Sequence, residues 1–196
     1  MNRIFAARFQ PFHNGHLAVL EKILDIYQSD IIIGVVLFNL NDISSNPVFN
    51  RVHPINNPFT YWEIYQMIHG VIIEKKFKTD FNISILPIPA VQNWWYLTKR
   101  FLPQERIWIT PEGEYKIDDK RFFDLLGEKF DIFQPPLRKV SGKLVRYRLA
   151  FKRDWESLVP ISTKIILNQI NAEKRMSHLF SQYNIGCFDE ATLSCG

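Results

Sequence analysis

Residues 8–17 read R-F-Q-P-F-H-N-G-H-L. It lies between an apolar run over residues 3–9, which predicts a β-strand, and residues 15–27, whose apolar side chains recur every three or four positions as in an amphipathic helix. A polar turn at the carboxyl end of a parallel strand is where open α/β sheets bind their ligands. The turn is therefore the first candidate for a functional site.

The alternation of strand and helix continues along the chain. Residues 31–38 form an apolar run rich in β-branched residues, which is typical of a strand buried on both faces of a parallel sheet. Further strands are expected at 81–88, 105–110 and 130–134, and further helices at 62–75, 93–101, 117–128, 143–151 and 160–171. Strands separated by helices imply right-handed crossovers, so we predict an α/β fold with a doubly wound, parallel five-stranded sheet and C-terminal helices.

Composition restricts the class of protein. Of 196 residues, 46% are hydrophobic and 22% are charged, which excludes a chain that is disordered throughout. The run at 31–38 is too short to span a bilayer, the early arginines do not fit a secretory signal, and two cysteines do not make a disulfide scaffold or a zinc site. We therefore expect a cytoplasmic protein that does not bind membranes. A net charge of +4 suits anionic small molecules and is too weak to indicate nucleic acid.

Two segments do not follow the alternation. Residues 39–57 are rich in Asn and have no period, which is typical of a lid or an insertion. Residues 174–196 have weak periodicity, so we expect one domain over residues 1–173 followed by a C-terminal tail that is either flexible or a partner-binding arm.

The turn at 8–17 carries groups suited to phosphate. Gly15 allows the backbone to pass close to a ligand, and His16 lies in the first helical turn, where free N–H groups attract anions. His13 and His16 can face the same ligand, with Arg8 just upstream. A polar loop with a helix cap is the alternative, but the strand, turn and helix context favours a phosphate site.

A second basic cluster follows Ser141, a good helix N-cap, and Gly142. Lys143, Arg146 and Arg148 fall in the first two helical turns, where cations oppose the helix dipole. A capped surface helix would explain the serine but not these charges, whereas a bound polyphosphate would explain both. Asn93 and Trp95, just past an expected strand, would suit an aromatic ligand that carries a carboxamide, although both tryptophans at 94–95 could equally be core residues.

These residues resemble the H-x-G-H nucleotidyltransferase superfamily, in particular the archaeal-type nicotinamide mononucleotide adenylyltransferases and the matching domain of cyanobacterial bifunctional enzymes. The resemblance rests on R-F-Q-P-F-H-x-G-H at 8–16, N-P-F-T at 57–60 with Glu63, N-W-W at 93–95, S-G-K-L-V-R at 141–146, and D-W to V-P over 154–160. It extends to about residue 170 and implies a Rossmann-like nucleotidyltransferase fold for the expected domain.

The resemblance also implies an activity, namely transfer of the AMP part of ATP to nicotinamide mononucleotide, which forms NAD and releases pyrophosphate. It implies that Arg8, His13, His16 and Arg146 are catalytic. The residues expected to bind ATP are Phe9, Gln10, Gly15, His16, Ser141, Lys143 and Arg146. Those expected to bind the acceptor are Asn93, Trp95, Phe59 and Arg51. We see no carboxylate cluster for a metal, so Mg2+ is expected to arrive with the nucleotide, and a homo-oligomer stays open.

Several departures from the family pattern leave alternatives open. The family's Arg after Glu63 is Ile64, its Thr after Gly142 is Lys143, and the connection before residue 57 is longer than usual. Arg51 could replace the lost cation. The alternatives are the same chemistry on another phosphorylated acceptor, as an adenylyl- or cytidylyltransferase, and a catalytically silent nucleotide-binding protein. His53, His69 and His178 are isolated and are expected to be structural or solvent-facing.

Overall fold

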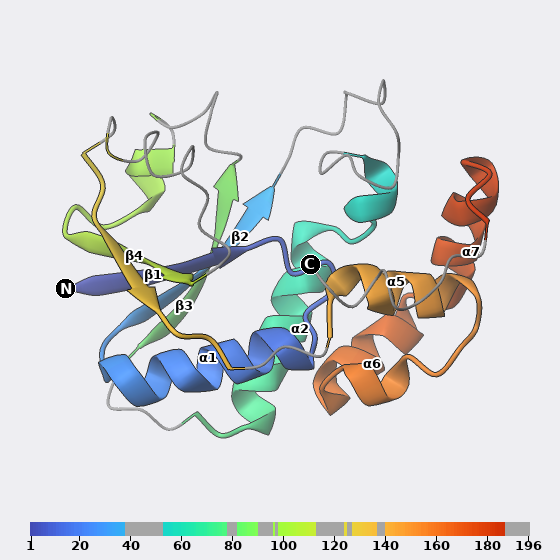
Figure 1. Ribbon diagram of the computed structural model, residues 1–196, viewed down its shortest axis with the longest axis horizontal. Coiled ribbons are helices and arrows are strands. Elements are labelled where there is room, and N and C mark those ends of the chain that lie inside the picture. Colours follow the sequence, from blue (N-terminus) through green and yellow to red (C-terminus); the bar gives the residue numbers. More distant parts are fainter. Residues whose placement is uncertain are drawn as a thin grey trace. The chain divides into compact units, whose positions relative to one another are not determined.

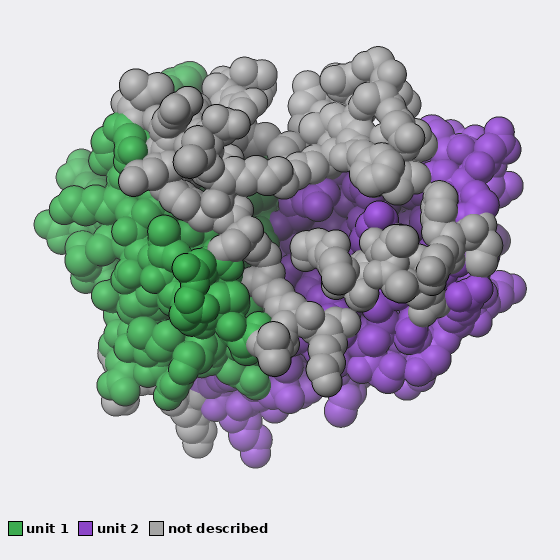
Figure 2. All heavy atoms as spheres, in the orientation of Figure 1, with its two compact units in different colours: residues 1–7, 18–37, 78–137 green, residues 8–17, 38–77, 138–196 purple. Residues whose placement is uncertain are grey.

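The computed structural model describes residues 1–37, 53–77, 82–89, 98–112, 127–136 and 140–186, together with the single residues 96 and 124 (Figure 1). The chain divides into two compact units, coloured green and purple in Figure 2, and each is described by itself. Unit 1 consists of residues 1–7, 18–37 and 78–137. Unit 2 consists of residues 8–17, 38–77 and 138–196.

Unit 1 is built on a parallel five-stranded sheet with the order β3-β2-β1-β4-β5. Its strands are β1 (Asn2–Ala7), β2 (Ile31–Leu37), β3 (Ile83–Pro89), β4 (Arg106–Pro111) and β5 (Phe130–Phe133). The order runs outward from β1 to β3 and then restarts on the other side of β1 with β4, which is the doubly wound pattern. The predicted fold class is confirmed, and each expected strand is present with ends shifted by at most two residues.

The core of unit 1 follows from the apolar composition of these strands. Ile31, Ile33 and Val35 of β2 are at most 1% exposed, as the β-branched run predicted. A cluster of buried residues joins several strands: Ile4, Ile32, Ile88, Leu102 and Trp108. Gly34 lies on β2 where a Cβ atom would meet Ile88 Cδ1 at 2.2 Å, so β2 and β3 pack closely because this position lacks a side chain.

The chain between β1 and α1 (Asn14–Tyr27) differs from the sequence prediction at one point. The strand was expected to continue to residue 9, but β1 ends at Ala7 and Phe9 adopts a φ of 52°. A left-handed backbone cannot continue a strand, so the chain turns there and enters the polar stretch that precedes α1. The predicted helices at 93–101 and 117–128 lie largely outside the described residues.

Unit 2 contains α2 (Tyr61–Glu74), α5 (Gly142–Ala150), α6 (Ile161–Gln169) and α7 (Ala172–Gln182), with short 3-10 turns η1 (Pro54–Asn56) and η2 (Glu156–Leu158). Helix α2 packs on α6, and the Ser162 hydroxyl and backbone N–H both donate to Glu74 Oε2, at 2.7 and 2.8 Å. Helix α5 packs on α7, where Ser177 Oγ donates to the carbonyl of Ala150 at 2.7 Å.

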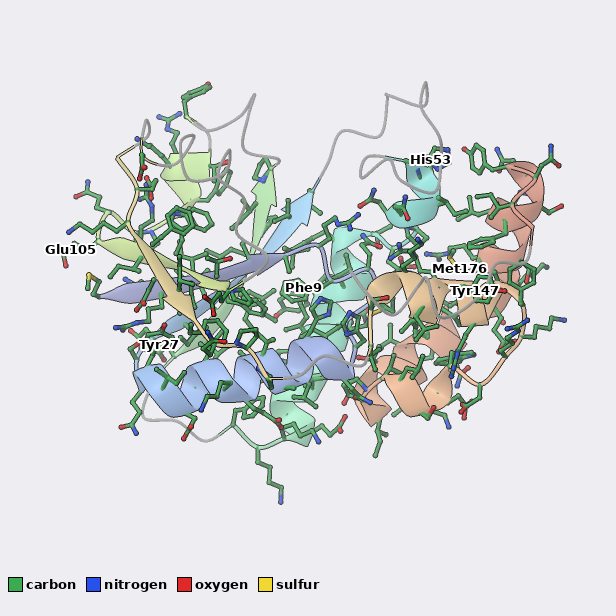
Figure 3. All side chains as sticks on the ribbon, viewed as in Figure 1. Phe9, Tyr27, His53, Glu105, Tyr147 and Met176 are labelled. Atoms are coloured by element: carbon green, nitrogen blue, oxygen red, sulfur yellow. The ribbon has the colours of Figure 1, made fainter. Side chains whose placement is uncertain are left out.

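Helix α7 lies across the boundary expected at residue 173. It begins at Ala172 and continues to Gln182. Its residues Ala172 and Met176 are at most 1% exposed. Met176 is labelled in Figure 3. Residues 174–182 are therefore part of a packed helix rather than a free arm, because α7 packs on α5 and Met176 is buried. Residues 187–196, the end of the expected tail, lie outside the described part of the chain.

The contact between β2 and β3 gives a stability prediction. Gly34→Ala would press a methyl group against Ile88 and should lower the free energy of unfolding by about 1–3 kcal/mol, the usual cost of overpacking a core. Chemical denaturation measures this change. The double variant Gly34→Ala/Ile88→Val, which removes the clashing Cδ1 atom, should recover part of the loss. Gly186→Ala, at an open position, is the matched control. Equal stability of Gly34→Ala and Gly186→Ala would contradict the packing argument.

Candidate active site

The turn after β1 rests on a small aromatic cluster. The Phe9 ring is 1% exposed, stacks on Phe12 with 5.6 Å between ring centroids, and meets the edge of His16 at 4.8 Å. The Phe9 side chain therefore supports the His16 ring from within unit 2. Its expected role in binding ATP stays a prediction.

His13 and His16 lie against one another. Their rings are stacked with 3.7 Å between centroids and an interplanar angle of 22°. His13 Nδ1 accepts the backbone N–H groups of Gly15 and His16 at 3.1 and 3.3 Å, and His16 Nδ1 accepts the N–H of His13 at 3.4 Å. Since Nδ1 of each neutral ring is an acceptor, its proton lies on Nε2. Each ring can then donate an N–H from the atom farthest from the backbone.

Gly15 and Gly142 allow the backbone to come close at two points of the site. A Cβ at Gly15 would lie 2.8 Å from the carbonyl of Val140 and 3.0 Å from the His13 ring. A Cβ at Gly142 would lie 2.8 Å from the carbonyl of Gln10 and 3.2 Å from Arg146 Nη1. The turn at 8–17 and the start of α5 thus touch only because both positions lack a side chain.

Arg146, on α5, is a buried cation at the centre of this contact. Its guanidinium is 5% exposed, with Nη1 donating to the carbonyl of Gln10 at 2.5 Å and Nη2 donating to Asn56 Oδ1 at 2.8 Å. Both acceptors are neutral. Burial, and then the nearby charge of Arg8, lower the pKa of Arg146 to about 9. The surroundings of Arg146 therefore disfavour its protonated, positively charged form. An anion bound beside Arg8 and Arg146 would stabilise that charged form.

The N-terminus of α5 has the predicted cap. Ser141 has an extended backbone, and its Oγ accepts the N–H of Leu144 at 3.2 Å. Lys143 is half-buried, and burial together with the charge of Arg146 lowers its pKa. Arg148, in contrast, donates to the carbonyl of Asp154 at 2.7 Å in an exposed position. Two of the three basic residues of this helix therefore add charge near the turn at 8–17.

Gln10 and Phe59 join the turn to the N-P-F-T element. The Gln10 amide donates from Nε2 to the carbonyl of Phe59 at 2.9 Å, and its Oε1 accepts the N–H of Phe59 at 3.0 Å. Gln10 is 5% and Phe59 is 4% exposed. The side chain of Gln10 thus holds the neighbouring loop, and its expected role toward ATP stays a prediction, as does the role of Phe59 toward the acceptor.

Sequence reasoning missed Asn56, which holds Nη2 of Arg146. Asn56 directly precedes the N-P-F-T element and is the last residue of η1. His53 caps this 3-10 turn, since its Nδ1 accepts the N–H of Ile55 at 3.2 Å. His53 is 1% exposed and burial lowers its pKa, so the expected structural role of this histidine is confirmed. Arg51, Asn93 and Trp95 lie outside the described residues. Ile64, which replaces the family's Arg, is fully buried.

Among the described residues, no group of three or more His, Cys, Asp or Glu side chains could hold a metal ion. In the same part of the chain, every helix is too short or too polar to cross a bilayer.

The neutral partner of Arg146 gives a prediction. Asn56→Asp would place a carboxylate against the guanidinium of Arg146, so the pKa of Arg146 and the melting temperature should both rise. Affinity for inorganic tripolyphosphate should fall by roughly tenfold or more, because the new carboxylate repels this anion at short range. Calorimetric titration and thermal melting measure both effects. Asn184→Asp, at an exposed position, changes the net charge equally and should change neither. Unaltered tripolyphosphate binding in Asn56→Asp would contradict the anion site.

Comparison with known proteins agrees with this geometry. Residues 4–76 match the sequence profile of the cytidylyltransferase-like family. A nicotinamide-nucleotide adenylyltransferase of Methanococcus aeolicus is 26% identical over 186 residues, which cover 91% of this chain and 95% of the relative. The enzyme of that name from Thermococcus sibiricus is 28% identical over 183 residues, covering 91% and 89%.

A solved structure supports the fold. The bifunctional NMN adenylyltransferase/ADP ribose pyrophosphatase of Francisella tularensis superimposes with a TM-score of 0.60 at 14% identity, over 95% of this chain and 57% of that one. This chain thus spans little more than half of that protein, and the likeness concerns the fold. The sequence relatives confirm the resemblance seen in the motifs: the chain is an enzyme of the nucleotidyltransferase type, similar over about nine-tenths of its length to archaeal nicotinamide-nucleotide adenylyltransferases.

Proposed function

We propose that this chain is a cytoplasmic enzyme that joins the AMP part of ATP to nicotinamide mononucleotide, forming NAD and pyrophosphate. The observation that carries the proposal is the buried guanidinium of Arg146, which within the described part of the chain donates to two neutral oxygens and lies near the charge of Arg8. Such a site favours a polyanion, and the two histidines beside it offer N–H donors. The names of the archaeal relatives supply the acceptor.

The reaction is a single in-line displacement. An oxygen of the acceptor's phosphate attacks the α-phosphorus of ATP and forms a new P–O bond, while the bond from that phosphorus to the bridging oxygen of the β-phosphate breaks. Pyrophosphate leaves with the electron pair of the broken bond. The attacking oxygen is already an anion, so no protein nucleophile or general base is needed. Catalysis then consists of positioning the reactants and stabilising negative charge on the phosphoryl oxygens.

The described residues can carry these tasks. His13 and His16, with protons on Nε2, would donate to the oxygens of the α-phosphoryl group. Arg8 and Arg146 would hold the triphosphate, and the capped N-terminus of α5 at Ser141 would receive its terminal phosphates. Lys143 would add charge at the same end. The nucleotide would enter as its Mg2+ complex.

The acceptor end is a proposal from the resemblance alone. Trp95 would stack on the nicotinamide ring, Asn93 would bind its carboxamide, and Phe59 and Arg51 would lie nearby. Ile64 is buried where the resembled family has a cationic Arg, so a different phosphorylated acceptor is the second candidate substrate.

One experiment tests the proposed reaction. The purified protein is incubated with Mg2+ and either ATP or CTP, together with a panel of acceptors that includes nicotinamide mononucleotide, a sugar phosphate and a phosphopantetheine, and pyrophosphate release is followed. We expect release only with ATP and nicotinamide mononucleotide. Pyrophosphate release with another pair would show that the enzyme is a nucleotidyltransferase with a different nucleotide or acceptor. No release with any pair would contradict the proposed function.

His16 gives a specific kinetic prediction. His16→Ala removes a preorganised donor to the phosphoryl oxygens and should lower kcat by a factor on the order of 10^2 or more. The melting temperature should change little, since His16 is only half-buried. His178→Ala, an exposed histidine of α7, is the matched control and should retain full activity. If His16→Ala turned over as fast as His178→Ala, the proposed donor role would be wrong.

A further inference from the structure

Helix α7 contributes one long side chain to the neighbourhood of the site. Arg175 donates from Nη1 to Glu63 Oε2 at 2.9 Å and from Nη2 to Glu63 Oε1 at 2.7 Å, which is a bidentate ion pair. The same Nη1 donates to the carbonyl of Pro58 at 3.0 Å, and the guanidinium carbon lies 5.8 Å from the centre of the Phe59 ring. Arg175 thus contacts two residues of the N-P-F-T element, Pro58 and Phe59, and the glutamate that follows it.

Glu63 is itself built into the start of α2. Its Oε2 accepts the N–H of Thr60 at 2.8 Å while Thr60 Oγ1 accepts the N–H of Glu63 at 3.3 Å, which together form a capping box. Burial alone would raise the pKa of Glu63, but the hydrogen bonds from Arg175 and Thr60 and the charge of Arg175 lower it. Arg175 therefore keeps this carboxylate ionised where it closes the loop at 58–60.

The loop continues the connection to the site. The Phe59 backbone is held on both sides by the Gln10 amide, and the carbonyl of Gln10 accepts Nη1 of Arg146. A continuous set of hydrogen bonds thus runs from Arg175 through the loop at 58–60 and Gln10 to Arg146. The cation expected directly after Glu63 is replaced by a buried Ile64, so in the described residues the charge beside this loop comes from α7 instead.

We propose that Arg175 is a positioning residue of the active site. It holds the loop at 58–60, and through Gln10 it fixes the turn that carries His13 and His16 and the carbonyl on which Arg146 rests. The kinetic part of this inference rests on the proposed function, whereas the part that concerns the order of the loop does not. Helix α7 thereby contributes to the order of the active site through Arg175.

The test compares three variants of the full chain. Arg175→Met keeps the length of the side chain and removes all donors, and Arg175→Lys keeps the charge but loses the bidentate pair. Lys174→Met, at the exposed neighbouring position, is the matched control. Amide hydrogen exchange of residues 56–60 and 8–17, kcat and the KM for ATP, and the pH dependence of kcat are measured on each variant.

In Arg175→Met we expect faster exchange of both segments and a loss on the order of tenfold in kcat/KM, the scale of effect expected when catalytic groups are slightly misplaced. The loss of activity at acid pH should begin at a higher pH than in the wild type, because the pKa-raising effect of burial on Glu63 is then opposed by the Thr60 hydrogen bonds without the help of Arg175. Arg175→Lys should lie between Arg175→Met and the wild type, and Lys174→Met should match the wild type.

Outcomes separate this inference from the proposed function. If the wild type releases no pyrophosphate with any acceptor, the proposed function fails and amide exchange alone decides the role of Arg175. If Arg175→Met does not fold, the folded Arg175→Lys variant decides by the same measurements. Unchanged exchange at 56–60 and 8–17 in the folded variant would overturn the inference, and so would wild-type kinetics and an unshifted pH profile in an active enzyme.

Discussion

The site depends on the buried guanidinium of Arg146. This one group joins α5 to the carbonyl of Gln10 in the turn after β1 and to Asn56 in η1, which are 136 and 90 residues away in the sequence. Burying a charge against neutral acceptors is costly, since two dipoles replace only part of its hydration. The charge of Arg8 adds to the unfavourable energy of the buried Arg146 cation. A polyanionic ligand bound beside both arginines would make the charged form of Arg146 favourable. The contacts of Arg146 with Gln10 and Asn56 therefore bring the three segments of the candidate site together.

Much of the surrounding structure brings these segments close and keeps them in register. Gly15 and Gly142 remove the side chains that would separate the turn from α5. Phe9 and Phe12 form the apolar support on which the His16 ring lies, and backbone N–H groups hold Nδ1 of both histidines as acceptors. The protons of the imidazoles are thereby directed to Nε2. Rigid placement of donors before the ligand arrives is the property that electrostatic catalysis requires.

The sequence predicted those parts that depend on local patterns. The run of β-branched residues at 31–37 became the buried β2, Ser141 became a helix cap, and the glycine between two histidines marks the close turn. Contacts between distant segments could not be predicted. Asn56 matters only because it meets Arg146, and Arg175 only because it meets Glu63, 112 residues earlier. Helix α7 was missed because most of its residues are polar, although its buried residues Ala172 and Met176 are four positions apart and therefore share one face. The expected strand end at Phe9 was wrong since its left-handed backbone has no signal in an apolar residue.

In the proposed mechanism, the turn at 8–17 presents neutral, Nε2-protonated imidazoles to the phosphates of ATP beside Arg146. Nitrogen NMR of the histidine side chains locates these protons, with His178 as an internal reference on an exposed helix face. We predict that His13 and His16 have an unprotonated Nδ1 and a protonated Nε2 in the free protein, and that saturation with the Mg2+ complex of ATP shifts both Nε2–H resonances while those of His178 stay in place. Protons on Nδ1, or Nε2–H resonances that do not move when ATP is bound, would contradict the account.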